Sequence, residues 1–211
     1  MGDATNIRAV IFDLGGVLID WDPKLVYRQI FAGDQAKMEM FLSTICPTEW
    51  NERQDAGRPL AEATEERVAL YPEWEAEIRA FYGRWVEMIG GPIPGTAQLV
   101  RELSAAGVRL FALSNWSAET FPLIRHQFSE LELFEKIFLS GEYGCIKPDE
   151  RYYRIALGDI GLPVETLLFI DDNRRNILAA ERLGLPSLVF TDAEALRRDL
   201  RALGFAIGPG T

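Results

Sequence analysis

Acidic side chains stand directly after two of the apolar segments of this chain. Asp13 follows the run Ala-Val-Ile-Phe at residues 9–12, and Asp171 and Asp172 follow Leu-Leu-Phe-Ile at residues 167–170. Carboxylates behind a buried segment are costly unless a cation compensates them, and three of them suit a hard cation with oxygen ligands. Mg²⁺ fits such ligands best. A carboxylate oriented by the cation can attack phosphorus as a nucleophile, and Asp13 is the candidate.

Further polar side chains follow other apolar segments. Ser114 and Asn115 end the run Arg-Leu-Phe-Ala-Leu, and Lys147 stands in the loop Cys-Ile-Lys-Pro. A lysine and a hydroxyl from neighbouring strands could hold the oxygens of a phosphoryl group during transfer to Asp13. Taken singly, each residue has a structural explanation, because Ser114 or Asn115 could cap a helix and Lys147 could be a solvated surface charge.

The alternation of strands and helices decides whether these side chains meet. Short apolar runs predict strands at residues 9–12, 108–115, 136–140, 166–171 and 186–190. Helical patterns predict helices near residues 96–107, 118–128, 149–161, 176–184 and 193–204. Five strands joined by helices predict an α/β fold with a Rossmann-like, doubly wound parallel sheet. Because ligands collect beyond the carboxyl ends of such strands, the polar groups converge on one rim.

A helical insertion is expected beside that rim. From Pro23 to Glu87 the chain has helical patterning and no convincing strand, with helices expected at residues 25–31, 37–45, 60–71 and 73–88. Residues 48–58, between two of these helices, are expected to form a loop. A polar and aromatic cluster lies in this loop, formed by Trp50, Arg53, Gln54 and Asp55. In it Trp50 could stack on a substrate and Arg53 could pair with an anionic substituent, although a solvated helix end explains the cluster almost as well.

Composition narrows the function further. The 211 residues are 48% hydrophobic and 26% charged, as in soluble globular proteins, and the net charge of -10 argues against binding to nucleic acid or anionic membranes. No apolar run reaches the roughly 18 residues that span a bilayer, and the first residues lack the pattern of a secretory signal, so a cytoplasmic location is expected. The single histidine, His126, is expected at the surface or in packing, and Cys46 and Cys145 as reduced, structural thiols.

Four motifs resemble those of the haloacid dehalogenase-like hydrolase superfamily, and they occur in the same order. FDLGGVL at residues 12–18 resembles the nucleophile motif, LSN at 113–115 the Ser/Thr motif, CIKPDERYY at 145–153 the Lys-Pro motif, and FIDDNRRNI at 169–177 the acidic metal motif. The resemblance covers nearly the whole chain. It implies a Rossmann-like core at residues 1–19 and 90–211 and a small helical cap at residues 20–89. Segments 20–23 and 90–94 would be the hinges on which the cap closes.

The resemblance also implies roles for the site residues. Asp13 is the expected nucleophile, and Ser114 and Lys147, with Asn115 beside them, are expected to bind the substrate. Asp172, with Asp171 assisting, is expected to hold Mg²⁺ together with Asp13 and the backbone carbonyl of Gly15. Asn176 stands at a position that orients the site.

One position departs from the pattern. Phosphatases of the superfamily usually carry a second aspartate two residues after the nucleophile as general acid and base, and here that residue is Gly15. Asp20 and Asp22 are candidate replacements, although a loop role is favoured for each. General acid catalysis typically contributes about 10²- to 10⁴-fold, so its loss would slow a phosphatase without abolishing it. The pattern DLGxV also resembles a branch that includes sugar-phosphate phosphatases.

Three functions are therefore compared. The first is a Mg²⁺-dependent phosphatase acting on a small phosphorylated metabolite, such as a sugar phosphate. The second is a 2-haloacid dehalogenase, but such enzymes resemble the pattern with an aromatic residue at the position of Gly15 and lack the paired carboxylates of Asp171 and Asp172. The third is a catalytically idle binding protein, which would have lost several site residues, whereas only Gly15 departs. The sequence favours the phosphatase.

Overall fold

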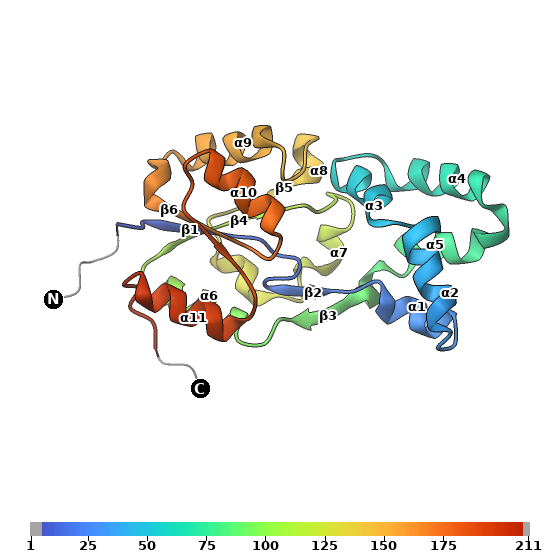
Figure 1. The fold of residues 1–211 in the computed structure, drawn as a ribbon, viewed down its shortest axis with the longest axis horizontal. Coiled ribbons are helices and arrows are strands. Elements are labelled where there is room, and N and C mark those ends of the chain that lie inside the picture. Colours follow the sequence, from blue (N-terminus) through green and yellow to red (C-terminus); the bar gives the residue numbers. More distant parts are fainter. Residues whose placement is uncertain (1–5, 209–211) are drawn as a thin grey trace.

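A five-stranded parallel sheet forms the centre of the larger lobe (Figure 1). The computed structural model describes residues 6–208. The strands are β1 (Ala9–Phe12), β4 (Arg109–Ser114), β5 (Lys136–Leu139), β6 (Leu167–Asp171) and β7 (Ser187–Val189), in the spatial order β5-β4-β1-β6-β7 with every neighbouring pair parallel. The predicted doubly wound α/β fold and its five strands are thus confirmed.

Helices cover both faces of this sheet. Helices α6 (Thr96–Ala105) and α11 (Ala193–Ala202) lie on one face, and α9 (Glu150–Ile160) and α10 (Arg174–Arg182) on the other (Figure 1). The side chains of β1 alternate between these layers, since Val10 and Phe12 join the core with α6 and α11 while Ala9 and Ile11 join the core with α9 and α10. A strand buried on both faces reads as a continuous apolar run, which is why β1 was evident in the sequence.

Shorter elements complete the larger lobe. They are α7 (Phe121–Arg125), α8 (Ser140–Tyr143) and the 3₁₀ turns Ser129–Leu133 and Val164–Thr166. His126 follows α7 and is exposed, and the two cysteines are both free and buried. Within residues 6–208, no helix is long and apolar enough to cross a membrane.

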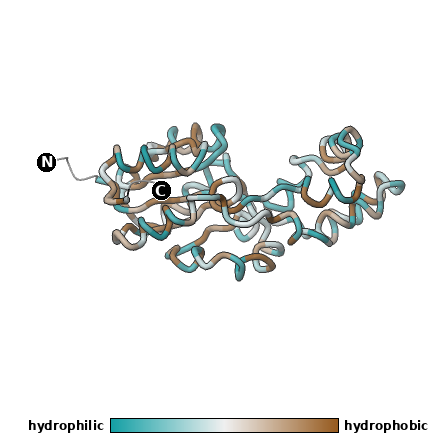
Figure 2. The backbone as a smooth tube through the Cα atoms, turned by 90° about the horizontal axis from the view of Figure 1, so that it is seen from below, coloured by the Kyte–Doolittle hydropathy of each residue, from teal (hydrophilic) through white to brown (hydrophobic). Residues whose placement is uncertain are grey.

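The smaller lobe is helical and lies away from both termini (Figures 1 and 2). This helical lobe, residues 22–88, contains α1 (Lys24–Ile30), α2 (Gln35–Met40) with a π-helical turn (Phe41–Ile45), α3 (Thr48–Asp55), α4 (Leu60–Leu70), α5 (Glu75–Gly83) and the 3₁₀ turns Pro72–Trp74 and Trp85–Met88. Its interior is aromatic, with the ring of Tyr27 against those of Phe31, Phe41 and Phe81. Figure 2 shows hydrophobic segments running through both lobes.

The prediction of a loop at residues 48–58 is wrong over most of the segment, because α3 occupies it. The segment has one large apolar side chain, Trp50, so its sequence carries no apolar periodicity. Polar contacts hold the helix instead: Gln54 Nε2 donates to the Trp50 carbonyl and to the Tyr82 hydroxyl, and Asn51 Nδ2 donates to Asp55.

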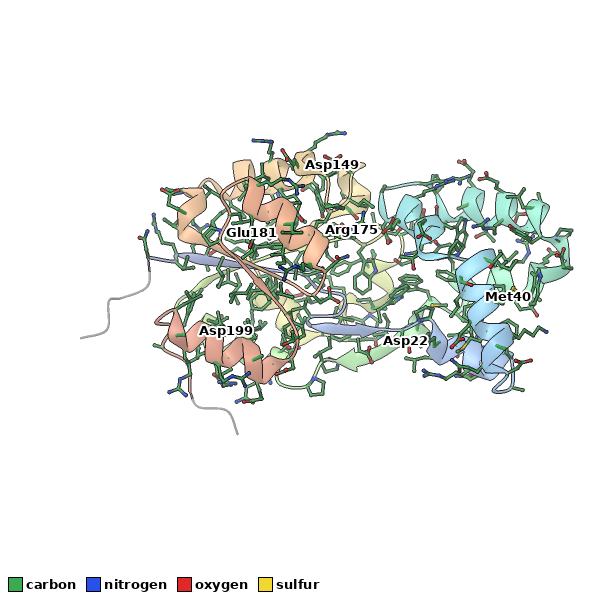
Figure 3. All side chains as sticks on the ribbon, viewed as in Figure 1. Asp22, Met40, Asp149, Arg175, Glu181 and Asp199 are labelled. Carbon is green, nitrogen blue, oxygen red and sulfur yellow. The ribbon has the colours of Figure 1, made fainter. Side chains whose placement is uncertain are left out.

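An antiparallel ribbon joins the two lobes. Strand β2 (Ile19–Trp21) pairs with β3 (Ile89–Pro92), so the segments expected as hinges lie side by side. At Gly90 an added Cβ would lie 2.1 Å from Oδ2 of Asp20, so only glycine fits there without displacing that carboxylate. Asp22 follows the ribbon (Figure 3), and its Oδ1 accepts the N–H of Lys24, the first residue of α1. The hinge motion itself stays a prediction.

Candidate active site

The strand register places two of the predicted acids side by side. Phe12 on β1 pairs with Ile170 on β6, so Asp13 and Asp171, each one residue further on, stand at the same level of the sheet. The Asp13 N–H donates to the Ile170 carbonyl at 2.8 Å. The carboxyl ends of the central strands thus bring together acids that are far apart in the sequence.

Lys147 lies between these two carboxylates. Its Nζ is 2.9 Å from Oδ2 of Asp13 and 2.7 Å from Oδ2 of Asp171, and its side chain is fully buried. Burial lowers the pKa of Lys147, but the two carboxylates raise it above its usual value, so the lysine stays cationic. Asn115 fixes the backbone of this lysine, accepting its N–H at 2.7 Å and donating to its carbonyl at 2.9 Å.

Asp171 is saturated by hydrogen bonds. Its Oδ1 accepts the Asn173 N–H at 2.8 Å, both of its oxygens accept from Asn176 Nδ2 at 3.0 Å, and Lys147 takes Oδ2. The orienting position expected for Asn176 is therefore on this carboxylate. These contacts orient Asp171 and hold Lys147 against it, and the Asp171 carboxylate still lies beside those of Asp13 and Asp172.

The three acids form a cluster that fits a hard cation. One oxygen from each of Asp13, Asp171 and Asp172 lies within 4.8 Å of the others, and Asp172 is exposed. Burial raises the pKa of Asp13 to about 7, Lys147 opposes that shift, and the charges of Asp171 and Asp172 add to it. Three carboxylates around one lysine carry excess negative charge, and an all-oxygen donor set suits Mg²⁺, the predicted cofactor.

Gly16 allows Asp172 to approach the loop that follows β1, residues 13–18. Its φ is +75°, and an added Cβ would lie 2.4 Å from Oδ2 of Asp172. We expect Gly16→Ala to cost about 1–2 kcal/mol of stability from backbone strain and to weaken Mg²⁺ binding about 10- to 100-fold by displacing that carboxylate. Isothermal titration with Mg²⁺ measures the affinity.

Gly107→Ala is the matched control for this substitution. Gly107 also has a positive φ, +79°, but nothing lies within 4 Å of its added Cβ. It should share the strain and leave Mg²⁺ affinity unchanged. Equal Mg²⁺ affinities in the two variants would contradict the placement of Asp172 at the metal.

Ser114 places a buried hydroxyl group at the rim that can still form hydrogen bonds. Its Oγ has no hydrogen-bond partner within the part of the chain that the structure describes, and the residue is almost completely buried at the end of β4. A buried hydroxyl without a partner costs free energy, which a ligand oxygen would recover. The predicted role in binding a phosphoryl group therefore agrees with its surroundings.

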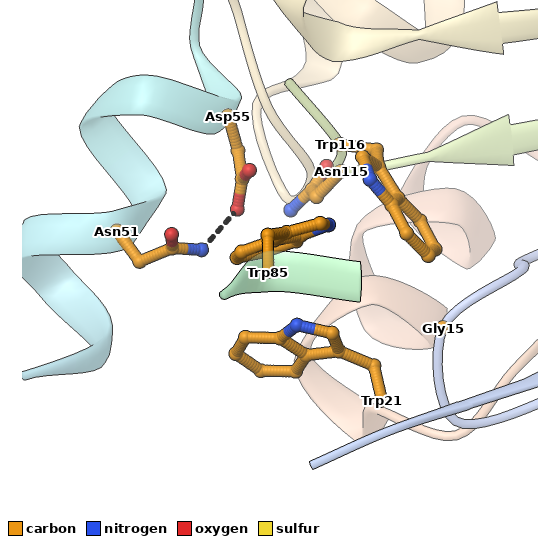
Figure 4. A pocket seen from close by; sticks show the side chains of 7 residues that line it. All are labelled: Gly15, Trp21, Asn51, Asp55, Trp85, Asn115 and Trp116. Carbon is orange, nitrogen blue, oxygen red and sulfur yellow. Dashed lines mark hydrogen bonds between the residues drawn. The ribbon is translucent and has the colours of Figure 1, made fainter. Parts of the chain in front are cut away.

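A pocket opens between the two lobes beside Gly15, in the loop that follows β1 (Figure 4). It holds about 330 Å³ of empty space, part of it open to solvent, and its lining is Gly15, Trp21, Asn51, Asp55, Trp85, Asn115 and Trp116. The ring of Trp85 stands edge-on to that of Trp116 at 6.4 Å and lies 5.4 Å from that of Trp21. The indole N–H groups of Trp21 and Trp85 are buried and have no partner among the described residues, so they are free to donate to a ligand.

The structure does not bring Trp50 and Arg53 to this pocket. Both line a separate cavity with Arg58 and Arg67, and the Trp50 ring is buried beneath the Arg67 guanidinium. The residues of α3 that reach the pocket are Asn51 and Asp55. Their spacing of four residues would have indicated a shared helical face if the segment had been interpreted as a helix.

The acids considered as proton donors also lie elsewhere. Asp20 is exposed on β2, whereas Asp22 accepts the Lys24 N–H and forms a 3.8 Å ion pair with Arg28. Neither is among the residues that line the pocket beside Gly15. The structural explanation considered for Asp22 is thus the one observed.

The chain is thus an α/β protein with an inserted helical lobe and a lysine-bound acidic cluster at the sheet rim. Residues 7–184 match the family model of the haloacid dehalogenase-like hydrolases, and the chain belongs to this family of enzymes. The resemblance inferred from the four motifs is confirmed.

Relatives cover almost the whole chain. The sesquiterpene phosphatase astK of Aspergillus oryzae is 30% identical over 200 residues, which span 94% of this chain and 97% of the relative. Protein CbbY of Rhodobacter capsulatus is 30% identical over 92% of this chain and 89% of its own length. Among solved structures, a predicted HAD-like family hydrolase from Porphyromonas gingivalis superposes with a TM-score of 0.70 at 26% identity, covering 92% of this chain and 98% of that one.

Proposed function

We propose that this protein is a Mg²⁺-dependent phosphatase that hydrolyses a small phosphorylated metabolite through an aspartyl phosphate on Asp13. The observation that carries the proposal is the cluster at the sheet rim, where Asp13 is held by Lys147 and faces Asp172. A relative named as a phosphatase, matched over nearly its full length, supports the reaction class. The paired acids favour phosphoryl transfer over the metal-free dehalogenase chemistry.

The side chains at the rim have different roles in phosphoryl transfer. The Leu14 N–H donates to Oδ1 of Asp13 at 2.7 Å and Lys147 binds Oδ2, so the carboxylate is oriented before it attacks phosphorus. Ser114 and Lys147 offer donors for the phosphoryl oxygens. When bound by Asp13, Asp172 and the Gly15 carbonyl, Mg²⁺ would neutralise the charge on those oxygens.

The pocket favours an apolar ester group on the phosphate. Its surface is mainly tryptophan, and its two amides are already engaged: Asn115 by the Lys147 backbone, and Asn51 by Asp55 and the Tyr82 hydroxyl. The side-chain groups that remain to pair with a ligand are the indole N–H groups of Trp21 and Trp85 and the Asp55 carboxyl. A sugar has more hydroxyl groups than these can pair with, and each one left unpaired costs about 1–3 kcal/mol. We therefore propose an apolar alcohol in place of the sugar expected from the nucleophile motif, and the named sesquiterpene phosphatase supports this preference.

The experiment is a release assay with purified protein on prenyl and alkyl monophosphates, hexose phosphates and a 2-haloacid. Phosphate release is expected with Mg²⁺, is lost with chelator and returns on adding Mg²⁺. The value of kcat/KM should be about 10-fold or more higher for the apolar esters, equivalent to about two buried methylene groups. Chelator-resistant release would contradict the mechanism, and a hexose preference would contradict the apolar pocket. Halide release would support the dehalogenase function, and no detectable activity on any compound would support a catalytically idle binding protein.

A further inference from the structure

The pocket beside Gly15 contains a single ionisable side chain. Of the seven lining residues only Asp55 carries a carboxyl group, and it comes from the end of α3 in the helical lobe (Figure 4). Gly15 itself contributes no side chain, and an added Cβ there would have 4.0 Å to the ring of Trp116. The space beside the nucleophile loop is thus open, and a carboxyl group reaches the same pocket from the opposite lobe.

The surroundings of Asp55 keep its carboxyl oriented without a cation. Asn51 Nδ2 donates to Oδ2 at 2.8 Å, and Tyr82 fixes that amide by donating its hydroxyl to Asn51 Oδ1 at 2.9 Å. The Ser117 backbone gives Asp55 a further hydrogen bond. No ion pair involves Asp55 in the described part of the chain.

Burial decides the protonation of this carboxyl. It raises the pKa of Asp55 to about 8, the Ser117 hydrogen bond opposes the shift, and the negative charge of Glu52 adds to it. Tyr82, the other titratable group facing Asp55, stays neutral because burial raises its own pKa further. Asp55 therefore carries a proton at neutral pH and can accept one back, as a general acid and base must.

Close contacts fix Asp55 against the larger lobe. The Ser140 hydroxyl donates to the Asp55 carbonyl, and an added Cβ on Gly57 would lie 2.8 Å from the Gly141 carbonyl oxygen. Nearby, the Leu60 N–H donates to Glu119 at 3.0 Å. These contacts reach the segments that follow β4 and β5. Strand β4 ends at Ser114, and β5 precedes the segment that carries Lys147. The position of Asp55 is therefore tied to the catalytic rim when the lobes are docked.

We propose that Asp55 is the general acid and base of this enzyme, supplied by the helical lobe in place of the aspartate missing at Gly15. The inference rests on the proposed phosphatase function. As an Asp13 oxygen bonds to phosphorus and the ester P–O bond breaks, Asp55 gives its proton to the leaving alcohol. In the second step Asp55 takes a proton from water, whose oxygen bonds to phosphorus as the bond to Asp13 breaks, which releases phosphate and restores both acids.

The test compares esters with poor and good leaving groups in the variant Asp55→Asn. For an alkyl phosphate, kcat should fall about 10²- to 10⁴-fold, because the alkoxide needs a proton. For p-nitrophenyl phosphate, whose leaving group needs little protonation, the same variant should lose less than about 10-fold. Wild-type kcat for the alkyl ester should fall above about pH 8, where Asp55 loses its proton, and the variant should lack this decline.

Two further variants keep the test decisive. Asp199→Asn, on the outer helix α11 (Figure 3), should leave both esters unaffected. Glu52→Gln removes a negative charge that raises the pKa of Asp55, so the pH above which kcat declines should be lower in this variant. Measuring this decline tests Asp55 even if Asp55→Asn fails to fold. Equal losses on both esters in Asp55→Asn, or a wild-type enzyme whose kcat for the alkyl ester does not decline at alkaline pH, would overturn the assignment. A wild-type enzyme that hydrolyses neither ester would instead contradict the proposed function.

Discussion

Asp13→Asn is expected to lower kcat for phosphate release by about 10⁴-fold or more, because an amide cannot form the acyl phosphate. The substitution keeps the shape of the side chain, and Lys147 retains its second partner, Asp171. Rapid acid quenching of wild-type enzyme during turnover should yield protein carrying one phosphoryl group on Asp13, detected by peptide mass spectrometry. The variant should yield none.

The same variant has an expected signature in stability without metal. Burial raises the pKa of Asp13 to about 7 from its ordinary value near 4. Between these values the folded protein holds a proton that the unfolded chain releases, so this group makes the free energy of unfolding fall as pH rises. Asp13→Asn should remove that decline, as measured by thermal unfolding in chelator. Substantial turnover in a variant whose mass excludes deamidation back to aspartate would contradict Asp13 as the nucleophile.

Lys147→Met should destabilise the protein by about 3–5 kcal/mol, since removing one partner of a buried ion pair leaves the other charge uncompensated. Here two carboxylates, Asp13 and Asp171, would lose the buried cation that lies within 2.9 Å of each. Urea unfolding at neutral pH measures the loss. The deficit should shrink on acidification, because burial raises the pKa of Asp13 to about 7 and its protonation removes part of the uncompensated charge.

Lys136→Met is the matched control for this prediction. Lys136 pairs with Asp159 at 2.9 Å on the surface, where both side chains are exposed. Water and salt weaken such a pair, so its loss should leave the unfolding midpoint nearly unchanged. A similar midpoint in the two variants would show that the buried lysine does not neutralise the acidic cluster.

The sequence predicted the core of this protein well because the core follows local rules. A run such as Ala9–Phe12, apolar on both faces, can be stable only inside a parallel sheet with helices on each side. The carboxyl ends of parallel strands meet at one edge, so Asp13, Ser114 and Asp171 could be placed together before their distances were known.

The helical lobe was predicted less completely because its details depend on contacts between segments. The α3 segment, with polar residues on most of its surface, gives no local signal for a helix. It is held by Tyr82 from α5 and by Ser140 from the other lobe. Trp50 and Arg53 were predicted to contact the substrate because of their residue types. The orientation of α3 instead turns both side chains away from the pocket beside Gly15.

The sequence by itself determined the family, the parallel sheet, the acidic cluster with its lysine, and the absence of a side chain at Gly15. Only the tertiary structure decided what surrounds that gap, namely three tryptophans and the buried carboxyl of Asp55. The physical reason is the range of the interactions. The buried strands and the order of the motifs can be recognised from local sequence. The protonation of Asp55 depends instead on burial, which arises when residues far apart in the sequence pack around it.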